Sequence, residues 1–547
     1  MFNKKSTTDR AADSVPITES TLFSARAQKQ VFNTNAVNEN RHIIHSKGDH
    51  RLDDKGESIV PLNIKFIYLD MSLDPNWIGS YYEGIGSIMT VLKRAGHNTS
   101  LLQVIKLLDD KDVLDFVDND TDLVAFSTTT NMFPLVQKWS SLLKKHYPNI
   151  PLLCGGNHPT LAPKETLQQS ALDWACVGEG EKFILSLADY LQNKRTLEDI
   201  SSLVYRKESK IIVNQSYLAE SNLDTLPVVD RTLFAEHITK CSTPEVFTSR
   251  GCPYSCTFCC NESKKLTLPN PGKYLRFFSP QRVIETLLEI KKHSKIEYFM
   301  FIDDVFGVNL KWLKEFSIMY NEQIKLPFKC EMDPRYIREE VIEILADMGC
   351  ISINMGLQSG DEHIRNNVMK RNMSVERVKK SIEICQKNNI ETKVDIIFGT
   401  PTETKQQMIR TVDLLAQLDV NHAKTHIFYP FPYTELEVLT RKMGLIETNK
   451  FNVDMLSGSI LKYSKAHKRV ILFMHVYSDK IVQILKPMYK SNSLIVTLFR
   501  KIFMKVIFSS IFIHTTVLAR KRFLQFRACY RKIRGLKALN YNNIETW

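Results

Sequence analysis

Short apolar runs alternate with helix-forming stretches through most of the 547 residues of this chain, and this alternation limits the folds open to it. In the first half, apolar runs of the buried parallel-strand type lie at 64–70, 122–128, 150–156 and 174–180, and helical stretches follow them. Repeated β–α units of this length predict an α/β fold with a doubly wound parallel sheet over residues 62–201. Ligands of such sheets bind beyond the carboxyl ends of the strands.

A second β/α series follows two short apolar runs at 203–206 and 210–214, which predict a hairpin inside a linker over 202–237. Its strands are expected at 246–251, 296–303, 328–332, 351–359, 392–399 and 422–431. Six such units are fewer than the eight of a closed TIM barrel. We therefore predict a partial (β/α)6 barrel of the TIM type, open on one side, over residues 238–455.

The N-terminal end of the chain departs from this alternation. Residues 1–60 are polar and lack the apolar core of a signal peptide, so we expect a disordered extension. No stretch reaches the roughly 20 apolar residues that a membrane-spanning helix needs. The nearest, 506–519, contains a histidine. A cytoplasmic protein is therefore expected, with association at the periphery of a membrane left open.

Residues 456–547 form a basic region that is expected to be helical. Between 461 and 547 there are 18 lysines and arginines but only two acidic residues, so this region is more positive than the +13 of the whole chain. Basic helices can lie on an anionic membrane surface or bind the phosphates of a nucleic acid or a phosphorylated substrate. They can also cover the open side of the barrel. No aromatic platform or named motif supports the nucleic-acid interpretation.

Four of the eleven cysteines lie within nine residues, in the loop RGCPYSCTFCCN that spans 250–261. Cys252, Cys256 and Cys259 have the spacing C-x3-C-x2-C, which indicates metal ligation in a reducing compartment. Thiolates bind iron–sulfur clusters, and three of them leave one iron of a four-iron cluster open to a small molecule. A structural zinc site with Cys260 as the fourth ligand is the alternative, although zinc knuckles use a distant second cysteine pair that is missing here.

This loop resembles the cluster-binding loop of the radical S-adenosylmethionine (SAM) superfamily, in which an aromatic residue, here Phe258, precedes the last cysteine. The resemblance implies a 4Fe-4S cluster on the three cysteines, with Cys260 outside the ligand set. It also implies that SAM chelates the open iron. One electron, from a donor such as flavodoxin or ferredoxin, then cleaves SAM to methionine and a 5′-deoxyadenosyl radical.

Two later segments extend the resemblance to the SAM site. FIDDVF (301–306) implies a contact between Asp304 and the amino group of SAM, while Asp303 has the alternative role of capping the next helix. NMGLQSG (354–360) has Gln358 where the family has a glutamate that contacts the ribose. An amide can still donate and accept hydrogen bonds with hydroxyls, but it carries no charge.

A third segment, DIIFGTPTET (395–404), matches the family's GxPxET motif. The resemblance implies that Gly399 lets the backbone approach the adenine and that Pro401 fixes the turn. Thr404 is expected to cap the following helix, and the charge of Glu403 is expected to favour the helix N-terminus.

The first sheet resembles the cobalamin-binding domain found ahead of many radical SAM cores. Four segments carry this resemblance: YYEGIGSIMTVLKRAGH (81–97), FSTTTN (126–131), GGNHPTLAP (155–163) and VGEGE (177–181). The residues that the resemblance places near cobalamin are Tyr81, Gly84, Ser127, Thr128, Thr129, Gly155, Gly156, His158, Gly178, Glu179 and Gly180. The region 69–79 lacks the histidine that ligates cobalt in some members, so cobalamin is expected to bind without a histidine below the metal. His158 is expected to serve the cofactor pocket or the local structure.

Together these resemblances imply a cobalamin-dependent radical SAM enzyme with three cofactors: a 4Fe-4S cluster, SAM and cobalamin. The expected reaction is methylation of an unactivated carbon of a small-molecule or lipid substrate, with a second SAM remethylating cobalt. Cyclisation, oxidation or rearrangement without methyl transfer is an alternative, and a non-catalytic metal-binding sensor is another. The sequence defines neither the substrate nor catalytic residues beyond the cofactor contacts.

Overall fold

The computed structural model describes residues 41–49, 60–71, 81–215, 219–231, 242–267, 274–293, 295–446 and 458–533. The sequence predictions for 1–40, 50–59 and 534–547 therefore lie outside the described residues.

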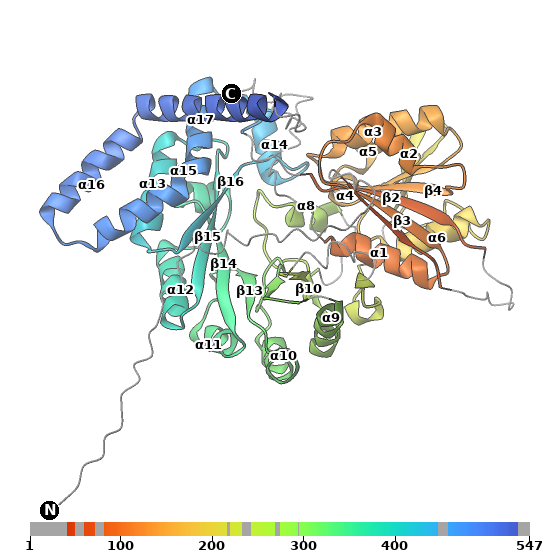
Figure 1. The fold of residues 1–547 in the computed structure, drawn as a ribbon, viewed down its shortest axis with the longest axis horizontal. Coiled ribbons are helices and arrows are strands. Elements are labelled where there is room, and N and C mark those ends of the chain that lie inside the picture. Colours follow the sequence, from red (N-terminus) through yellow and green to blue (C-terminus); the bar gives the residue numbers. More distant parts are fainter. Residues whose placement is uncertain are drawn as a thin grey trace, which may run out of the picture. The chain divides into compact units, whose positions relative to one another are not determined.

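The N-terminal half contains an eight-stranded sheet with the strand order β1-β3-β2-β4-β5-β6-β7-β8 (Figure 1). Its strands are β1 (Arg41–Ser46), β2 (Asn63–Leu69), β3 (Asn98–Val104), β4 (Leu123–Ser127), β5 (Leu152–Gly155), β6 (Trp174–Cys176), β7 (Leu203–Lys207) and β8 (Lys210–Val213). The five strands β3-β2-β4-β5-β6 are parallel, whereas β1, β7 and β8 pair antiparallel with their neighbours. The predicted parallel sheet is confirmed.

The chain reverses its direction across this sheet at β2, which lies between β3 and β4. In open α/β sheets a crevice for a ligand forms at such a switch point, outside the carboxyl ends of the strands. β2 ends at Leu69 and β4 ends at Ser127. These two strand ends therefore mark where a ligand of this domain is expected.

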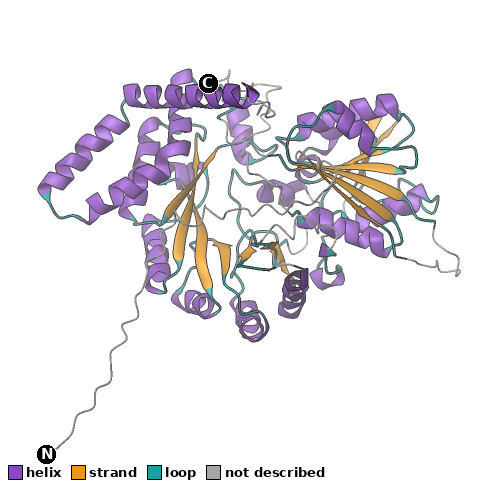
Figure 2. Ribbon diagram, viewed as in Figure 1, coloured by secondary structure: helices purple, strands orange, loops and turns teal. Residues whose placement is uncertain are grey.

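Helices cover both faces of the sheet (Figure 2). One face carries α1 (Glu83–Arg94) and α6 (Glu181–Leu191), and the other carries α2 (Asp110–Phe116), α3 (Phe133–His146) and α5 (Pro163–Gln168), which follows the short α4 (Asn157–Leu161). Side chains of the strands alternate between two cores. In β2, Ile64 and Phe66 join the core under α1 and α6, while Ile67 and Leu69 join the opposite core.

Three features of this sheet differ from the sequence prediction. β1 lies inside the expected disordered extension, because Arg41–Ser46 pairs along its whole length with β3. β3 was not expected as a strand, since polar residues interrupt its apolar run. β7 and β8 form the expected hairpin, but β7 pairs with β6, so the hairpin extends the first sheet instead of acting as a linker.

The second half contains six parallel strands in the order β9-β12-β13-β14-β15-β16. The strands are β9 (Glu245–Val246), β12 (Phe299–Phe301), β13 (Phe328–Met332), β14 (Cys350–Gln358), β15 (Glu391–Phe398) and β16 (His422–Ile427). The helices of this half are α8 (Cys260–Thr267), α9 (Pro280–His293), α10 (Leu310–Gln323), α11 (Glu339–Asp347), α12 (Val375–Lys387), α13 (Lys405–Gln417) and α14 (Glu435–Lys442). The six predicted parallel strands are confirmed.

The first of these strands is shorter than predicted. The expected run 246–251 divides into β9 and β10 (Ser249–Arg250), and β10 pairs antiparallel with β11 (Arg276–Phe277). The cause lies in Thr248, whose backbone N–H donates to the side chain of Asp303 at 3.0 Å instead of to a strand.

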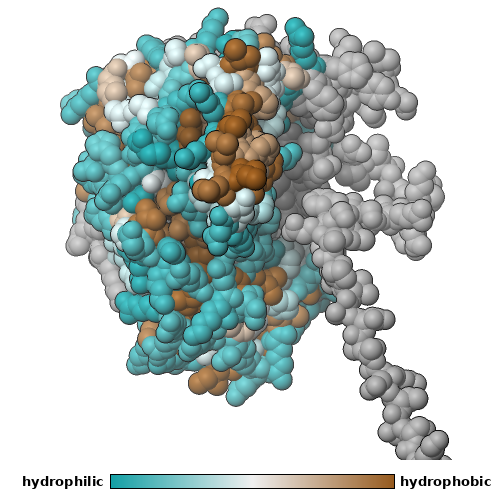
Figure 3. Space-filling model, turned by 90° about the vertical axis from the view of Figure 1, so that its left-hand side faces the viewer, coloured by the Kyte–Doolittle hydropathy of each residue, from teal (hydrophilic) through white to brown (hydrophobic). Residues whose placement is uncertain are grey.

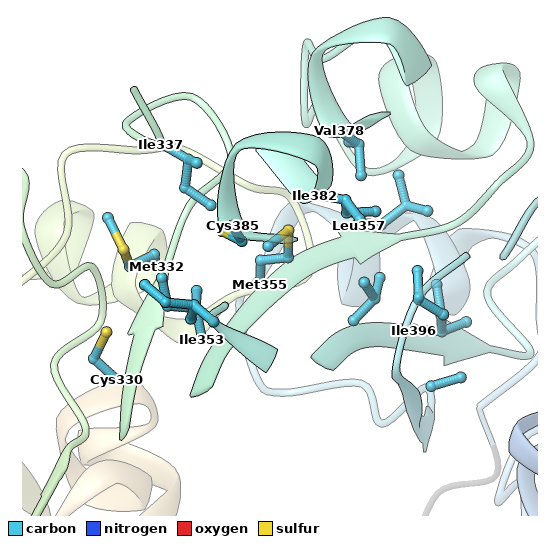
Figure 4. Packing of buried hydrophobic residues seen from close by; sticks show 14 of the residues in the cluster. Cys330, Met332, Ile337, Ile353, Met355, Leu357, Val378, Ile382, Cys385 and Ile396 are labelled. Carbon is cyan, nitrogen blue, oxygen red and sulfur yellow. The ribbon is translucent and has the colours of Figure 1, made fainter. Parts of the chain in front are cut away.

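A continuous core packs behind the six-stranded sheet (Figure 4). Strand side chains meet helix side chains there, and the buried contributors include Met332, Ile353, Met355, Leu357, Val378 and Ile382. Cys330 and Cys385 belong to the same core, and burial raises the pKa of both thiols, that of Cys385 to about 12. These two cysteines are therefore apolar packing residues, separate from the cysteine loop.

Three helices end the described chain: α15 (Lys465–Lys490), α16 (Leu494–Ile507) and α17 (Ser510–Ile533). α15 packs against α13 and the edge strand β16, where the Asp479 side chain accepts from the backbone N–H of Ala423 at 2.8 Å. α15 thus covers an edge of the sheet, one of the roles left open for the basic region. Within the described residues no helix alone has the length and hydropathy to cross a membrane; α16 and α17 meet that criterion only jointly, with a 60° bend between them.

Candidate active site

The cysteine loop lies between β10 and α8, directly beyond the start of the second sheet. Cys256 is buried, Cys252 and Cys259 are partly exposed, and all three are free thiols. Thr257 anchors the loop: its N–H donates to the carbonyl of Met369 at 3.3 Å and its hydroxyl donates to that of Val368 at 2.7 Å. Three thiols therefore stand on one anchored loop.

A buried arginine lies beside these cysteines. Arg371 donates to Cys256 Sγ at 3.4 Å, to Asp333 Oδ2 at 2.8 Å and to the carbonyl of Gly356 at 2.6 Å. Burial alone would lower the pKa of Arg371, but the neighbouring Asp333 and Cys256 raise it by more than that. The net pKa lies above its usual value, so the guanidinium stays charged. A fixed positive charge favours thiolates and the negatively charged cluster that thiolates bind. Sequence reasoning missed Arg371 because only the fold brings it to the loop.

The donor set fits an iron–sulfur cluster better than a zinc ion. In the described part of the chain, no group of three or more His, Cys, Asp or Glu side chains could hold a single metal ion. A four-iron cluster has a different requirement, because each thiolate binds a different iron atom. Cys259 and Cys260 share a thiol hydrogen bond, which raises the pKa of Cys259 and lowers that of Cys260 to about 6.

The two adjacent aspartates after β12 have different surroundings. Asp303 is fully buried and accepts hydrogen bonds from Thr248 and from the hydroxyl of Ser249. It does not cap the next helix, which was its alternative role, because Asn309 caps α10. Burial raises the pKa of Asp303 to about 6. Asp304 is exposed and lines a cavity of about 490 Å³, which fits its predicted contact with SAM.

Gln358 ends β14 in a strained conformation. Its φ is +70°, and the pairing of β14 with β15 shifts register between Gly356 and Gln358. The side-chain Oε1 is buried and has no hydrogen-bond partner among the described residues. A buried amide oxygen without a partner can accept from a ligand hydroxyl, so the residue fits its predicted contact with the SAM ribose.

The turn after β15 is held by the side chain of Glu403, which was expected to act only as a charge at the helix N-terminus. Glu403 is buried and accepts from the backbone N–H groups of Gly399 at 2.7 Å and Thr400 at 3.4 Å, and burial raises its pKa to about 8. It therefore fixes the turn and is not a solvated charge at a helix end. Thr404 caps α13 as predicted, in a capping box with Gln407.

Gly399 has φ +82°, and a side chain there would meet Ile471 of α15 at 2.8 Å. The structure thus gives a packing reason for this glycine, whereas its approach to adenine stays a prediction. Pro401 is buried in the same turn, and Phe258 packs in a small core with Phe428 and Leu436.

One cavity of about 490 Å³ has walls from both halves of the chain. The first sheet contributes seven of the eleven residues predicted near cobalamin: Gly84, Ser127, Gly155, Gly156, Gly178, Glu179 and Gly180. The second half contributes residues around the cysteine loop, among them Gly251, Cys260 and Asp304. Gly156 has φ +100°, and a Cβ there would meet the carbonyl oxygen of Thr128 at 2.7 Å. The packing of this turn against Thr128 therefore requires glycine at 156, whereas the approach of cobalamin to it stays a prediction.

Four residues predicted near cobalamin do not line this cavity: Tyr81, Thr128, Thr129 and His158. The ring of His158 stacks on Phe133 with centroids 3.9 Å apart, and burial lowers its pKa to about 4. Tyr81 lies under the guanidinium of Arg231, 3.7 Å from its ring centroid. The ring of His158 therefore packs against Phe133 and does not line the cavity, and the choice between a cofactor role and a structural role stays open.

Ion pairs join the two walls of the cavity. Arg276 of β11 contacts Glu179 at 2.7 Å, and Arg250 of β10 contacts Glu181 at 2.7 Å. Burial alone would raise the pKa of Glu179, but the hydrogen bond and charge of Arg276 lower it by a larger amount. The net pKa is therefore below the usual range. Arg250 precedes Cys252 by two residues. The glycine loop after β6 is thus tied to the strand that leads into the cysteine loop.

Comparison with known proteins agrees with this geometry. The model of the radical SAM superfamily matches residues 246–415, and that of the B12 binding domain matches residues 83–188. The class is thus a radical SAM enzyme with a preceding B12 binding domain. The chain belongs to the cobalamin-dependent radical SAM family, whose typical cofactors are a 4Fe-4S cluster, SAM and cobalamin.

Relatives and solved structures are distant. An uncharacterized methyltransferase of Pyrococcus horikoshii is 25% identical, covering 68% of this chain and 78% of the relative. The cytidylyl-2-hydroxyethylphosphonate methyltransferase of Streptomyces wedmorensis is 21% identical, covering 67% and 79%. The apo structure of the cobalamin-dependent SAM radical enzyme OxsB has a TM-score of 0.64 at 15% identity and covers 86% of this chain and 81% of OxsB. These structural likenesses show the shared fold.

Proposed function

We propose that this enzyme transfers a methyl group to an unactivated carbon of a small-molecule or lipid substrate. The observation that carries the proposal is the single cavity of about 490 Å³ whose walls come from the strand ends of the first sheet and from the region of the cysteine loop. When bound, the cluster with SAM supplies radical chemistry and cobalamin supplies a methyl group. Three distant relatives named as methyltransferases support the same reaction type.

The residues of this chain have distinct roles in the proposal. Cys252, Cys256 and Cys259 would hold the cluster, and Arg371 would place a positive charge beside Cys256. Asp304 and Gln358 would position SAM through its amino group and ribose. The electron would come from a low-potential donor such as flavodoxin or ferredoxin.

Glycine backbone on the first wall would carry the corrin. Gly155, Gly156 and Gly178 leave the strand ends without side chains at the cavity, while Ser127 offers a hydroxyl. The ion pair between Glu179 and Arg276 would fix this wall relative to the cysteine loop. A fixed separation between cofactors favours catalysis by positioning and by exclusion of water.

A second candidate is radical chemistry without methyl transfer. It is favoured by similarity to the anaerobic magnesium-protoporphyrin IX monomethyl ester cyclase of Cereibacter sphaeroides, which is 18% identical and covers 64% of this chain and 61% of the relative. A cyclase would use the same cavity and cofactors, but cobalamin would not donate a methyl group to the substrate.

Anaerobic turnover of SAM separates these candidates. The reconstituted holoenzyme with dithionite should release 5′-deoxyadenosine, and methyl transfer should add S-adenosylhomocysteine. Deoxyadenosine without S-adenosylhomocysteine, in the presence of added methylcobalamin, would favour the cyclase type of reaction. Release of neither product would contradict catalysis and would favour a metal-binding sensor.

A further inference from the structure

Helix α16 carries its large apolar side chains on the outside. None of its residues is buried. Six large apolar side chains are between 52 and 87% exposed: Leu494, Ile495, Leu498, Phe499, Ile502 and Val506. Figure 3 shows apolar residues gathered in a band on the face of the molecule that carries this helix. Contiguous exposed apolar surface of this kind marks an interaction site.

The helical repeat explains why these side chains form one stripe. Leu494, Leu498, Ile502 and Val506 are spaced by four residues, so they lie along one line of the helix, and the remaining two lie in the adjacent row. The opposite side packs inward through Phe503, Met504 and Ile507. The exposed side chains Ile511 and Phe512 extend the surface onto the start of α17. We call these eight exposed residues the α16 face.

Positive charge borders the α16 face. Lys501 and Lys505 are exposed, lie at its edge, and have no ion-pair partner within the residues the structure describes. In the sequence, no acidic residue occurs between Asp479 and Glu545. The surface therefore combines an apolar stripe with unneutralised positive charge, which is the pattern of helices that lie in a membrane interface.

A groove beside the helix adds a place for a polar headgroup. It has a volume of about 560 Å³ and lies between α13 and α16. Lys405 and Lys505 supply cationic groups to it, Ile409 and Phe508 supply apolar surface, and Asp413 also lies on its wall. Arg410 lines the groove too, but it is paired with Asp361 at 2.6 Å. Lysines beside apolar side chains suit a phosphate headgroup attached to an acyl chain.

We propose that the α16 face docks this enzyme on the surface of an anionic lipid bilayer. The apolar stripe enters the boundary between headgroups and acyl chains, and Lys501 and Lys505 remain at the level of the phosphates. A second copy of the chain fits less well, because two such faces would bring lysines together without an acidic residue to pair with them. α16 contributes no residue to the lining of the 490 Å³ cavity, so the proposal stands independently of the reaction type.

Vesicle sedimentation with the full chain, kept free of oxygen, tests this proposal. The wild type should pellet with phosphatidylglycerol-containing vesicles, bind phosphatidylcholine vesicles about tenfold more weakly or worse, and lose affinity as salt rises. The double variant Leu498→Asp with Ile502→Asp should reduce binding by at least about tenfold, because it puts two charges into the stripe that the bilayer would bury. The double variant Lys501→Glu with Lys505→Glu should abolish the preference for anionic vesicles.

Matched controls separate the α16 face from general surface changes. Ile318→Asp with Leu107→Asp introduces the same charges at apolar side chains that are 62% and 53% exposed elsewhere, and should bind as the wild type does. Lys111→Glu with Lys145→Glu reverses two exposed lysines outside α16 and should keep the lipid preference. The proposal would be overturned if these controls lost vesicle binding or lipid preference as much as the α16 variants do. It would also be overturned if the wild type did not bind anionic vesicles. A wild-type dimer in light scattering that Leu498→Asp converts to a monomer would overturn it as well.

Discussion

The two walls of the cavity differ in the chemistry of their side chains. The wall from the first sheet presents glycine backbone, apolar side chains and glutamates, and no basic residue. The wall from the second half presents the basic residues Arg250, Lys264 and Arg276 together with Cys260 and Asp304. The first wall therefore offers space for a bulky ligand, whereas the second wall offers charged groups.

This difference indicates how one cavity can serve two cofactors. A large flat ligand needs backbone without side chains at the strand ends, which the glycines provide. A negatively charged cluster needs thiolates and nearby positive charge, which the cysteine loop and Arg371 provide. Opposite charges then hold the walls together, since Glu179 and Arg276 are mostly buried partners.

The largest expected effect concerns the charged side of the site. Arg371→Gln should destabilise the protein by about 2–4 kcal/mol, because Asp333 loses one of its two guanidinium partners and keeps only Arg335. It should also make the cluster harder to reduce by on the order of 100 mV, because a positive charge near it is lost. Denaturant unfolding and redox titration of the electron paramagnetic resonance signal measure the two effects.

Arg365→Gln is the matched control for Arg371→Gln. Arg365 is also buried, but its side chain donates to the backbone carbonyls of Met373 and Ser359, and no hydrogen bond joins it to a cysteine among the described residues. The Arg365→Gln variant should lower the stability of the protein without shifting the reduction potential of the cluster. An equal shift in both variants would mean that Arg371 has no special relation to the cluster.

The next effect concerns the shaped wall. Gly156→Ala should cost about 1–3 kcal/mol of folding free energy and reduce cobalamin binding, because its φ is +100° and the new Cβ would meet Thr128 at 2.7 Å. Gly155→Ala should leave stability nearly unchanged, since the nearest atom is 4.0 Å away. If cobalamin passes close to this wall, the Gly155→Ala variant should still bind it more weakly. Unchanged affinity in Gly155→Ala, measured by absorbance titration, would place the corrin elsewhere.

A third effect concerns the connection between the walls. A double-mutant cycle on Glu179→Gln and Arg276→Gln should give a coupling free energy of roughly 1–2 kcal/mol, because the pair is largely shielded from solvent. The same cycle on the exposed pair Lys314 and Glu340 should give no measurable coupling. Equal coupling in both cycles would show that Glu179 and Arg276 do not hold the walls together.

A fourth effect is a dependence of stability on pH at Glu403. Its folded pKa of about 8 lies above the unfolded value of 4.5, so the folded state binds the extra proton. Stability from this group is full below pH 4.5 and falls as pH rises to 8, by at most about 1.4 kcal/mol per pH unit. Glu403→Gln keeps the acceptor oxygen and should flatten the decline between pH 6 and pH 7. An identical slope in the variant and the wild type would contradict the buried, protonated carboxyl.

Much of the fold followed from local patterns in the sequence. The apolar run predicted at 328–332 coincides with β13, and the predicted cap Thr404 was confirmed, because both depend on neighbouring residues alone. β3 was missed since its buried face includes Thr99 and Gln103, whose polarity hides a strand that is enclosed between two others.

The site was predicted less completely than the fold. The cysteine spacing was readable, whereas Arg371 is 115 residues from its partner Cys256 and reaches it only through the fold. The motif GGNHP placed His158 beside a glycine turn, but the sequence did not reveal that the ring stacks on Phe133 and does not line the cavity. Side-chain direction at a strand end depends on tertiary packing, which no spacing rule supplies.

Iron and acid-labile sulfide analysis of the oxygen-free protein tests the central claim most directly, with Cys256→Ala compared against Cys260→Ala. The account predicts about four iron and four sulfide ions per chain in the wild type and in Cys260→Ala, and almost none in Cys256→Ala. Tightly bound zinc without sulfide in the wild type, or an intact cluster in Cys256→Ala, would contradict it.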